Sequence, residues 1–300
     1  TGRRNLPDQN KKKLWWSVMI WFKQNPEVHH HQLTLVYRAM RTTRQAVSQY
    51  LNRKNRHCEE ELTLIPIIKD IREDHPRMGL RHIYRKLSPK TMGRDLFIEF
   101  ARQYNLVLPK SKSPIRTTWS LPGLTTKNLV LGLEVTRVNQ LWVSDITYFW
   151  MGNHFAYLTF IMDMFSRKIL SAIASQTLLA DETVLPALKK AIKTRNNEIP
   201  PKLILHSDGG GQYFSHNVLT IIKKYTIQSS RAQSCYENAN AERINGTIKN
   251  DYLIPKKPQS FSELSLLLKK TVYLYNHEKT HSSLNNLTPD QFEYFIYKSK

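Results

Sequence analysis

The chain has 300 residues, 40% hydrophobic and 23% charged, with 45 Lys and Arg against 24 Asp and Glu and a formal net charge of +21. This composition is typical of a globular protein and excludes disordered and fibrous classes, while the length allows one large domain or two to three smaller ones. The two cysteines, without CxxC spacing, argue against a disulfide framework or a cysteine-rich zinc site and fit a reducing cytosolic compartment.

The positive charge is concentrated near the start of the chain. Residues 1–120 carry 24 basic and 10 acidic side chains, residues 121–260 carry 16 and 10, and residues 261–300 carry 5 and 4. An excess of this size indicates a polyanionic partner. The N-terminal part is the expected nucleic-acid-binding region, because contacts with phosphates require many Lys and Arg side chains. The alternative is that the charge serves only solubility.

Residues 1–58 are predicted to form a helical, helix-turn-helix-like DNA-binding module. In LTLVYRAMRTTRQAVSQYLNR at 33–53, apolar residues recur at helical spacing and are interrupted by the polar RTTR, which predicts two short helices with a tight joint. The second helix of such a motif presents its outward side chains to the major groove. The outward candidates here are Arg44, Gln45, Ser48, Gln49 and Asn52. An ordinary helical hairpin is the alternative.

Residues 59–107 are predicted to form a second small helical DNA-binding module. Three short helices are expected, with Pro76 and Gly79 at the first joint and Pro89 and Gly93 at the second. The candidate DNA contacts of this module are Arg81 and Arg85, with Lys86 and Arg94 nearby. Residues 108–137 mix Pro, Ser, Thr and basic side chains without periodicity and are predicted to be a linker.

Residues 138–255 are predicted to be an α/β domain, followed by a C-terminal helical extension over residues 256–300. Three β-rich runs, which indicate antiparallel strands, come first, and strands then alternate with helices. This order predicts a mixed sheet covered by helices. The expected strands cover 140–150, 154–165, 168–177, 202–208 and 227–231, with helices over 181–195, capped by Asp181, over 216–225 and beyond 238.

Three carboxylates fall at positions of this domain where functional groups are expected. The alternation of the first strand places Asp145 on the face opposite Trp142, and Asp208 ends an apolar central strand. In α/β sheets, sites are built in the crevice outside the carboxyl ends of the strands. On the following helix, Asn238, Glu242 and Lys249 share one face.

Three carboxylates from two strands and one helix suit two Mg²⁺ ions, which prefer oxygen ligands. Such an ion pair can activate the attacking oxygen and stabilise the leaving one in phosphodiester transfer. Each acid also has a structural alternative: Asp145 as a turn cap, Asp208 as an Asx-turn residue, and Glu242 as a solvated helix residue. Asp163 and Glu237 compete with them as ligands.

Five motifs in order resemble the catalytic core of insertion-sequence transposases of the two-reading-frame, copy-out and paste-in kind, which belong with retroviral integrases among the DDE enzymes of the ribonuclease-H-like fold. They are VSDITYFW, MDMFSRKIL, LILHSDGGGQY, SCYENANAERINGTIKNDY and YNHEKTHSSLNNLTPDQF, within residues 138–295. The resemblance implies a ribonuclease-H-like mixed sheet with helices on both faces, preceded by the helical modules. It also implies that Asp145, Asp208 and Glu242 are the catalytic, metal-binding triad and that Lys249 contacts the DNA end.

The activity implied by the resemblance is binding of the terminal inverted repeats of a mobile element, followed by metal-dependent DNA strand cleavage and strand transfer. The implied cofactor is two Mg²⁺ ions, with Mn²⁺ as a substitute, and the implied partners are double-stranded repeat and target DNA and further copies of the chain. We expect a cytoplasmic, nucleoid-associated bacterial protein without a membrane partner. Further residues expected at the DNA are Gln212, Tyr213, Asn238 and Arg243.

Two departures from the family pattern are visible. The 33 residues between Asp208 and Glu242 are fewer than the family usually has, which indicates a trimmed loop. The family's full product also begins with a coiled-coil segment from the first frame, and no sustained heptad pattern occurs here. We therefore expect either the second-frame part alone or a compact variant that uses residues 1–58 instead.

Other readings of HSDGGGQY at 206–213 are weaker. Three consecutive residues on one strand cannot place a base between a nucleophile and its orienting acid, and GGGQY lacks the ending of a P-loop. His206 is expected either to support the site indirectly or simply to pack, with packing favoured, and the glycines are expected to let the loop pass close to DNA. His29 to His31 without a Cys pair indicate a surface run and not a zinc site. The rival function is a catalytically inactive DNA-binding repressor.

Overall fold

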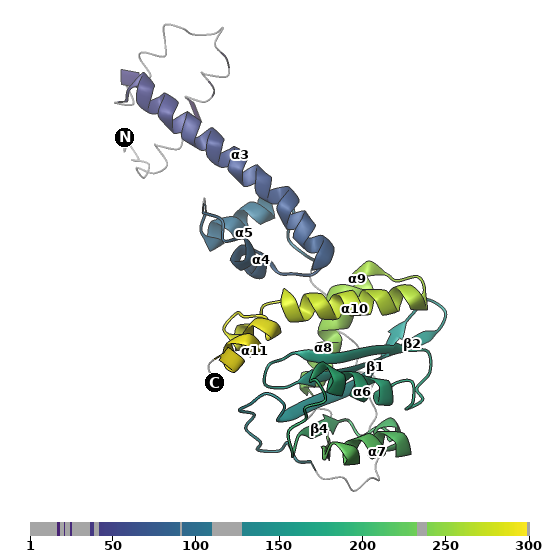
Figure 1. The fold of residues 1–300 in the computed structure, drawn as a ribbon. Coiled ribbons are helices and arrows are strands. Elements are labelled where there is room, and N and C mark those ends of the chain that lie inside the picture. The colour runs from purple at the N-terminus through teal and green to yellow at the C-terminus, as the bar shows by residue number, and fades with distance from the viewer. Residues whose placement is uncertain are drawn as a thin grey trace, which may run out of the picture. The chain divides into compact units, whose positions relative to one another are not determined.

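Figure 1 shows the computed structural model, which describes residues 42–90, 92–109, 128–232 and 239–298 and the single positions 17, 18, 21, 25, 37 and 38. The chain divides into two units, residues 1–67 with 89–93 and residues 68–88 with 94–300. All strands and all three candidate carboxylates belong to the second unit. In the described ranges, no helix is long and apolar enough to cross a membrane.

Helix α3 (Arg44–Asp74) is longer than its sequence pattern suggested. The Thr43 hydroxyl accepts the amide of Ala46 at its start, and the helix then continues for 31 residues. The prediction of a short helix ending near residue 53 is wrong, because no Gly or Pro occurs between 51 and 65 to end it. The predicted boundary between residues 58 and 59 therefore falls inside one helix. Most of the expected preceding helix lies outside the described residues.

Helices α4 (Leu80–Leu87) and α5 (Arg94–Gln103) form as predicted, and the rings of Tyr84 and Phe97 pack with centroids 5.6 Å apart. They belong to the same unit as the sheet, whereas the sequence predicted a separate module over residues 59–107. His75 is 3.0 Å from the Tyr252 hydroxyl, and Lys86 pairs with Glu278 at 2.5 Å. These polar contacts join the helices to the C-terminal part of the chain.

Five strands form one mixed sheet in the order β3-β2-β1-β4-β5. Strands β1, β2 and β3 are antiparallel neighbours, whereas β4 and β5 run parallel to β1. This is the ribonuclease-H-like topology predicted from the sequence, and the prediction is confirmed. The strands are β1 (Leu141–Trp150), β2 (Phe155–Asp163), β3 (Ile169–Ser175), β4 (Ile204–Ser207) and β5 (Gln228–Arg231).

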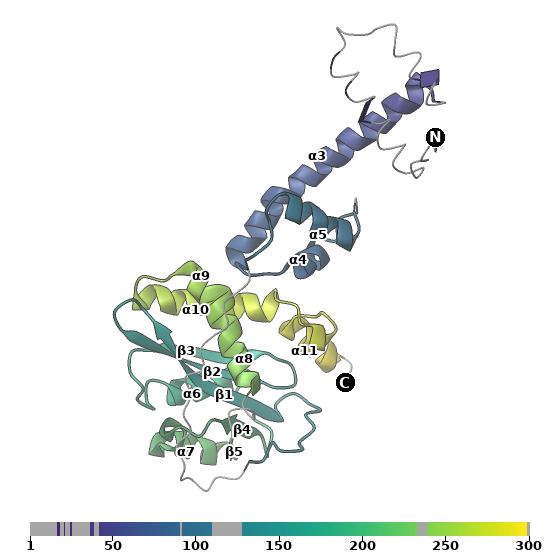
Figure 2. The same cartoon turned by 180° about the vertical axis from the view of Figure 1, so that it is seen from behind.

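Helices cover both faces of the sheet (Figures 1 and 2). Trp142 of β1 packs with helices α6 (Val184–Thr194) and α7 (His216–Lys224) on one face. Val143 packs with α8 (Ala239–Gly246) and α10 (Phe261–His277) on the other. The predicted alternation of β1 is thus confirmed, and Asp145 lies on the α8 face together with Val143.

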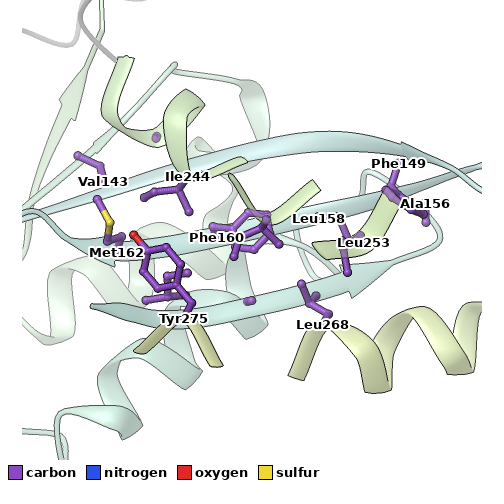
Figure 3. Packing of buried hydrophobic residues seen from close by; sticks show 14 of the residues in the cluster. Val143, Phe149, Ala156, Leu158, Phe160, Met162, Ile244, Leu253, Leu268 and Tyr275 are labelled. Carbon is purple, nitrogen blue, oxygen red and sulfur yellow. The ribbon is translucent and has the colours of Figure 1, made fainter. Parts of the chain in front are cut away.

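The core on the α8 face is shown in Figure 3, where side chains of β1 and β2 meet those of α8, α10 and the segment between them. The labelled members are Val143, Phe149, Ala156, Leu158, Phe160, Met162, Ile244, Leu253, Leu268 and Tyr275. The segment before β1 also contributes to this core, since Val130, Leu133 and Val135 pack against it. The end of the predicted linker over 108–137 is therefore part of the domain.

The C-terminal extension is helical, as predicted, and each of its two main helices starts with a side-chain cap. Ser260 accepts the amide of Glu263 at the start of α10. At the start of α11 (Pro289–Lys298), Thr288 and Gln291 each accept the other's amide, a reciprocal capping box. The predicted cap of α6 is wrong: its N-cap is Thr183, and Asp181 instead accepts a hydrogen bond from Asn217.

Asp163, a competing metal ligand in the sequence, has a structural explanation. Its side chain is fully buried and accepts the amides of Asn139, Phe165 and Ser166 at 2.7, 3.0 and 3.1 Å. The Arg195 guanidinium lies 3.4 Å away and also binds Glu293 of α11 through two bonds. Asp163 therefore closes the turn after β2 and helps to fix α11.

Candidate active site

The register of the parallel strands brings Asp145 and Asp208 to neighbouring positions. Val143 of β1 pairs with His206 of β4, and the same register continued by two residues places Asp145 beside Asp208. Asp208 follows the last residue of β4, where its side chain is exposed and accepts the amide of Gly210 at 3.1 Å. The two carboxylates are therefore carried by adjacent strands at the crevice where α/β sheets bind ligands.

Asp145 is the most perturbed acid of this region. Burial raises the pKa of Asp145 to about 8, and the negative charges of Asp208 and Glu242 act in the same direction. Hydrogen bonds from the backbone at Ile146 and from Asn245 lower it in part. Like charges that lie close together are costly to ionise at the same time. The ionisation of Asp145 is therefore coupled to the charges of Asp208 and Glu242.

Glu242 comes from α8, which crosses the sheet face that carries Asp145 (Figure 2). Its side chain is exposed, and its charge affects the pKa of Asp145 less than that of Asp208 does. Within the described ranges, no three His, Cys, Asp or Glu side chains already stand close enough to hold a metal ion. Glu242 is thus near the two aspartates without completing a ligand cage with them.

Asn245 is a site residue that the sequence reading missed. Its Nδ2 donates to Oδ2 of Asp145 at 2.5 Å, and its side-chain oxygen is buried without a hydrogen-bond partner among the described residues. The signal was present in the sequence, because Asn245 lies three residues after Glu242 and so shares its helix face. The amide is placed to hold Oδ2 of Asp145.

Lys249 lies against β1, although the helix that carries it is not the regular α-helix expected. After Gly246 the chain continues as a π-helical segment, η3 (Thr247–Leu253), which changes the angular spacing between Glu242 and Lys249. Lys249 Nζ donates to the Thr147 hydroxyl at 3.1 Å. Burial lowers the pKa of Lys249, whereas the charge of Asp145 raises it. The ammonium group is thus near the acids.

Tyr213 does not point outward as the DNA-contact prediction required. The Tyr213 side chain is 4% exposed, and its hydroxyl lies 2.9 Å from Ser144 Oγ. Tyr213 belongs to a short 3-10 turn, η1 (Gly211–Phe214), which places its side chain against the sheet. As placed, the Tyr213 side chain packs against β1 inside the domain and is not available to DNA. Gln212, beside it, is half-buried.

Of the three glycines after Asp208, Gly209 has the clearest structural requirement. Gly209 has a φ of +79°, and a Cβ there would lie 2.3 Å from Nε of Arg231. A Cβ on Gly210 would lie 2.8 Å from the Gln212 side-chain oxygen. His206 is fully buried with its Nδ1 2.9 Å from Ser230 Oγ, which confirms that it packs.

The other predicted DNA contacts are spread over both units. In the first unit, Arg44, Gln45 and Gln49 at the start of α3 are exposed and Ser48 is half-buried. Arg81 and Arg85 of α4 and Arg243 of α8 are exposed in the second unit. Asn238 and the competing acid Glu237 lie outside the described residues.

Comparison with known proteins shows what the sheet domain is similar to. Residues 135–235 match a model described as an integrase core domain, and residues 223–289 match a second model of the same description. A protein of insertion sequence element IS986/IS6110 from Mycobacterium tuberculosis is 35% identical over 170 residues, 54% of this chain and 60% of the relative. The transposase for insertion sequence element IS629 from Shigella sonnei is 29% identical over 76% of this chain and 77% of its own length.

Among solved structures, the integrase catalytic core domain of HTLV-2 in complex with magnesium is 23% identical over 51% of this chain and 95% of its own, with a TM-score of 0.42. The chain spans 60% of the length of the Mycobacterium relatives that it matches.

Proposed function

We propose that the chain is a transposase that joins the ends of a mobile element to new DNA, because residues 135–235 and 223–289 match integrase core domain models and a transposase of an insertion sequence is similar over 76% of the chain. It binds the terminal inverted repeats, hydrolyses a phosphodiester to free a 3′-hydroxyl, and uses that hydroxyl to attack a second strand. The observation that carries this proposal is the placement of three acids: the parallel register of β1 with β4 leads to adjacent positions for Asp145 and Asp208, and α8 carries Glu242 across the same face of the sheet.

Asp145, Asp208 and Glu242 are the residues that would hold two divalent cations, Mg²⁺ or Mn²⁺. The donor set fits, because it consists of carboxylate oxygens alone, which hard cations prefer. Burial is the largest cause of the raised pKa of Asp145, and the negative charges of Asp208 and Glu242 add to it, so that a bound cation would relieve their repulsion. When bound, the two cations activate the attacking oxygen and stabilise the charge on the leaving oxygen.

The chain's own residues orient the reacting groups. Asn245 donates to Oδ2 of Asp145 and so holds the orientation of that carboxylate. In the first step a water oxygen attacks phosphorus and the bond from phosphorus to the 3′-oxygen breaks, so that the 3′-oxygen leaves and takes up a proton. In the second step the freed hydroxyl loses its proton and attacks a target phosphorus, from which another 3′-oxygen departs.

DNA binding would involve both units. In the first unit, Arg44, Gln45, Ser48 and Gln49 would read the repeat; in the second, Arg81 and Arg85 would contact phosphates. Lys249, Gln212, Asn238 and Arg243 would lie along the strand end near the acids. Because two ends of an element are joined, a homodimer or a larger assembly on paired ends is expected.

Incubation of the protein with labelled duplex ends and Mg²⁺ tests the proposal. We expect cleavage and strand transfer by the wild-type chain and loss of both in Asp145→Asn, Asp208→Asn and Glu242→Gln, with end binding retained. Duplex binding by the wild-type chain without any cleavage in Mg²⁺ or Mn²⁺ would instead support the repressor. Retained cleavage in Glu242→Gln alone would transfer the third ligand to Glu237.

A further inference from the structure

The far end of the hairpin formed by β1 and β2 carries aromatic side chains that the proposed chemistry does not use. Tyr148 and Trp150 of β1 lie opposite Tyr157 and Phe155 of β2 in the strand register. Because side chains alternate along a strand, all four rings lie on one face of the hairpin, opposite to the face of Asp145. Three of them are about half exposed, with 51% for Tyr148, 54% for Trp150 and 49% for Phe155.

The elements that cover this face of the sheet end before the rings. The hydrophobic cluster under α6 and α7 includes Ile146 of β1 and no described residue of β1 beyond it. In the strand register, β4 pairs with β1 as far as Val143, and β3 pairs with β2 only from Tyr157 onward. The end of the hairpin is therefore a two-stranded ribbon, and the described residues leave this face of it uncovered.

The opposite face of the same ribbon is anchored in the core. Phe149 and Ala156 are register partners on that face, and both are buried. They belong to the same hydrophobic cluster as Leu253 and Leu268 (Figure 3). The ribbon is thus held firmly on one side while its aromatic side faces outward.

The rings also hold one another in place. The ring centroids of Trp150 and Phe155 are 4.8 Å apart, those of Tyr148 and Tyr157 are 5.3 Å apart, and those of Tyr148 and Phe155 are 6.0 Å apart, all edge-on. Side chains that are already fixed lose little conformational entropy when a partner binds. Cross-strand aromatic pairs also stabilise a hairpin by themselves, so binding has to be measured apart from stability.

The composition of the hairpin indicates the kind of partner. No Lys, Arg, Asp or Glu occurs from 146 to 162, although the chain carries a formal net charge of +21. A nucleic-acid surface needs cations for the phosphates, whereas aromatic side chains without charged neighbours are typical of the core of protein interfaces. Two copies of so basic a chain repel each other, and an uncharged patch is where they meet at the lowest electrostatic cost.

We propose that the aromatic face of the β1–β2 hairpin binds the same face of a second copy of this chain in a two-fold interface. In such an interface a patch contacts its own counterpart and must be complementary to itself, which rings that pack edge to face can satisfy. The pairing belongs to the free protein and does not depend on the proposed function. It leaves uncovered the face of β1 that carries Asp145.

The experiment is sedimentation of the full chain without DNA over a series of protein concentrations. We expect a dimer that dissociates on dilution, and a dissociation constant about 30-fold higher for Trp150→Thr, the effect of losing a central aromatic side chain of an interface. Tyr294→Gln is the matched control, since it removes a ring of α11 that is 61% exposed but has Lys298 Nζ 5.7 Å from its centroid. Its dissociation constant should equal that of the wild-type chain.

A pair of charged variants separates loss of binding from loss of folding. Trp150→Lys and Trp150→Glu should each be monomeric, because like charges then face each other, and an equimolar mixture should form the dimer again. Only folded chains can recover it. A monomeric wild-type chain at every concentration, a dimer unchanged by these substitutions, or a mixture that stays monomeric would overturn the proposal. So would weaker binding of a single-stranded oligonucleotide by Trp150→Thr at an unchanged oligomeric state, which would assign the rings to stacking on bases.

Discussion

The side-chain nitrogen of Asn245 donates a hydrogen bond of 2.5 Å to Oδ2 of Asp145, although the two residues are 100 positions apart in the chain. The contact joins a strand in the middle of the sheet to the helix that carries Glu242. The helix that supplies Glu242 therefore also fixes the orientation of the Asp145 carboxylate.

Replacement of Asn245 by Ala should lower DNA cleavage about 10- to 100-fold, the usual effect of removing a residue that orients a metal ligand. The reason is that Asp145 would then rotate. Rates at saturating DNA measure this, and the concentration of Mg²⁺ for half-maximal rate should rise as well. Asn250→Ala, an exposed asparagine five residues further along, is the control. A rate for Asn245→Ala equal to that of the control would contradict the orienting function.

Mg²⁺ should raise the melting temperature of the wild-type chain and have a much smaller effect on Asp145→Asn. A ligand at 100 times its dissociation constant stabilises the folded state by about 2.7 kcal/mol. Without metal, Asp145→Asn should be the more stable protein, because it removes a carboxylate from a crowded, partly buried position. Calorimetry with and without Mg²⁺ gives both quantities, and equal shifts in the two proteins would contradict the ligand assignment.

Tyr213→Phe should reduce stability by about 1 kcal/mol, the typical net contribution of one hydrogen bond. The partner hydroxyl of Ser144 is not left without a bond, since it also donates to the carbonyl oxygen of Phe160 at 2.9 Å. Affinity for duplex DNA should not change, because the Tyr213 side chain is buried. Urea unfolding and a binding titration test the two statements. A large loss of DNA affinity at unchanged stability would restore Tyr213 as a DNA contact.

The chain should lose stability as the pH falls from about 6.5 to about 4 through His281. Burial lowers the pKa of His281 to about 4, and Lys279, Arg167 and His82 add to the effect. Below the unfolded pKa of about 6.5 only the unfolded state gains the proton, so stability is full above that value and is lost on acidification. The shift corresponds to roughly 3 kcal/mol.

Unfolding free energies of the wild-type chain and of His281→Gln, compared at pH 7 and pH 5, measure this contribution. The difference between the two proteins should shrink at the lower pH, because glutamine takes up no proton. An unchanged difference would show that His281 does not titrate in this range.

Glu293→Ala should destabilise the protein by about 3 to 5 kcal/mol, the cost of removing one partner from a buried ion pair. Arg195 would lose two bonds to Glu293 and retain only Asp163 at 3.4 Å. The control is Glu198→Ala, which removes an exposed acid on the segment after α6. A loss no larger than that of the control in chemical unfolding would contradict the proposed anchoring of α11.

The sequence by itself determined the five strands, the sheet class and the faces of β1. These follow from local patterns: alternation separates Trp142 from Val143 and Asp145, and the apolar run before Asp208 identifies a buried strand. The family motifs identified the core domain because they preserve the order of these elements. The acids themselves could also be identified from the sequence, because a carboxylate on a core strand is costly unless it is hydrogen-bonded or binds a metal.

Only the tertiary structure decided which side chains meet. Three relationships join residues far apart in the chain: the register of β1 with β4, the bond of Asn245 to Asp145, and the burial of Tyr213 against Ser144. The length of α3 and the attachment of α4 to the sheet unit also differed from expectation. Local periodicity fixes which face a side chain takes, whereas its partner depends on packing between elements that periodicity does not encode.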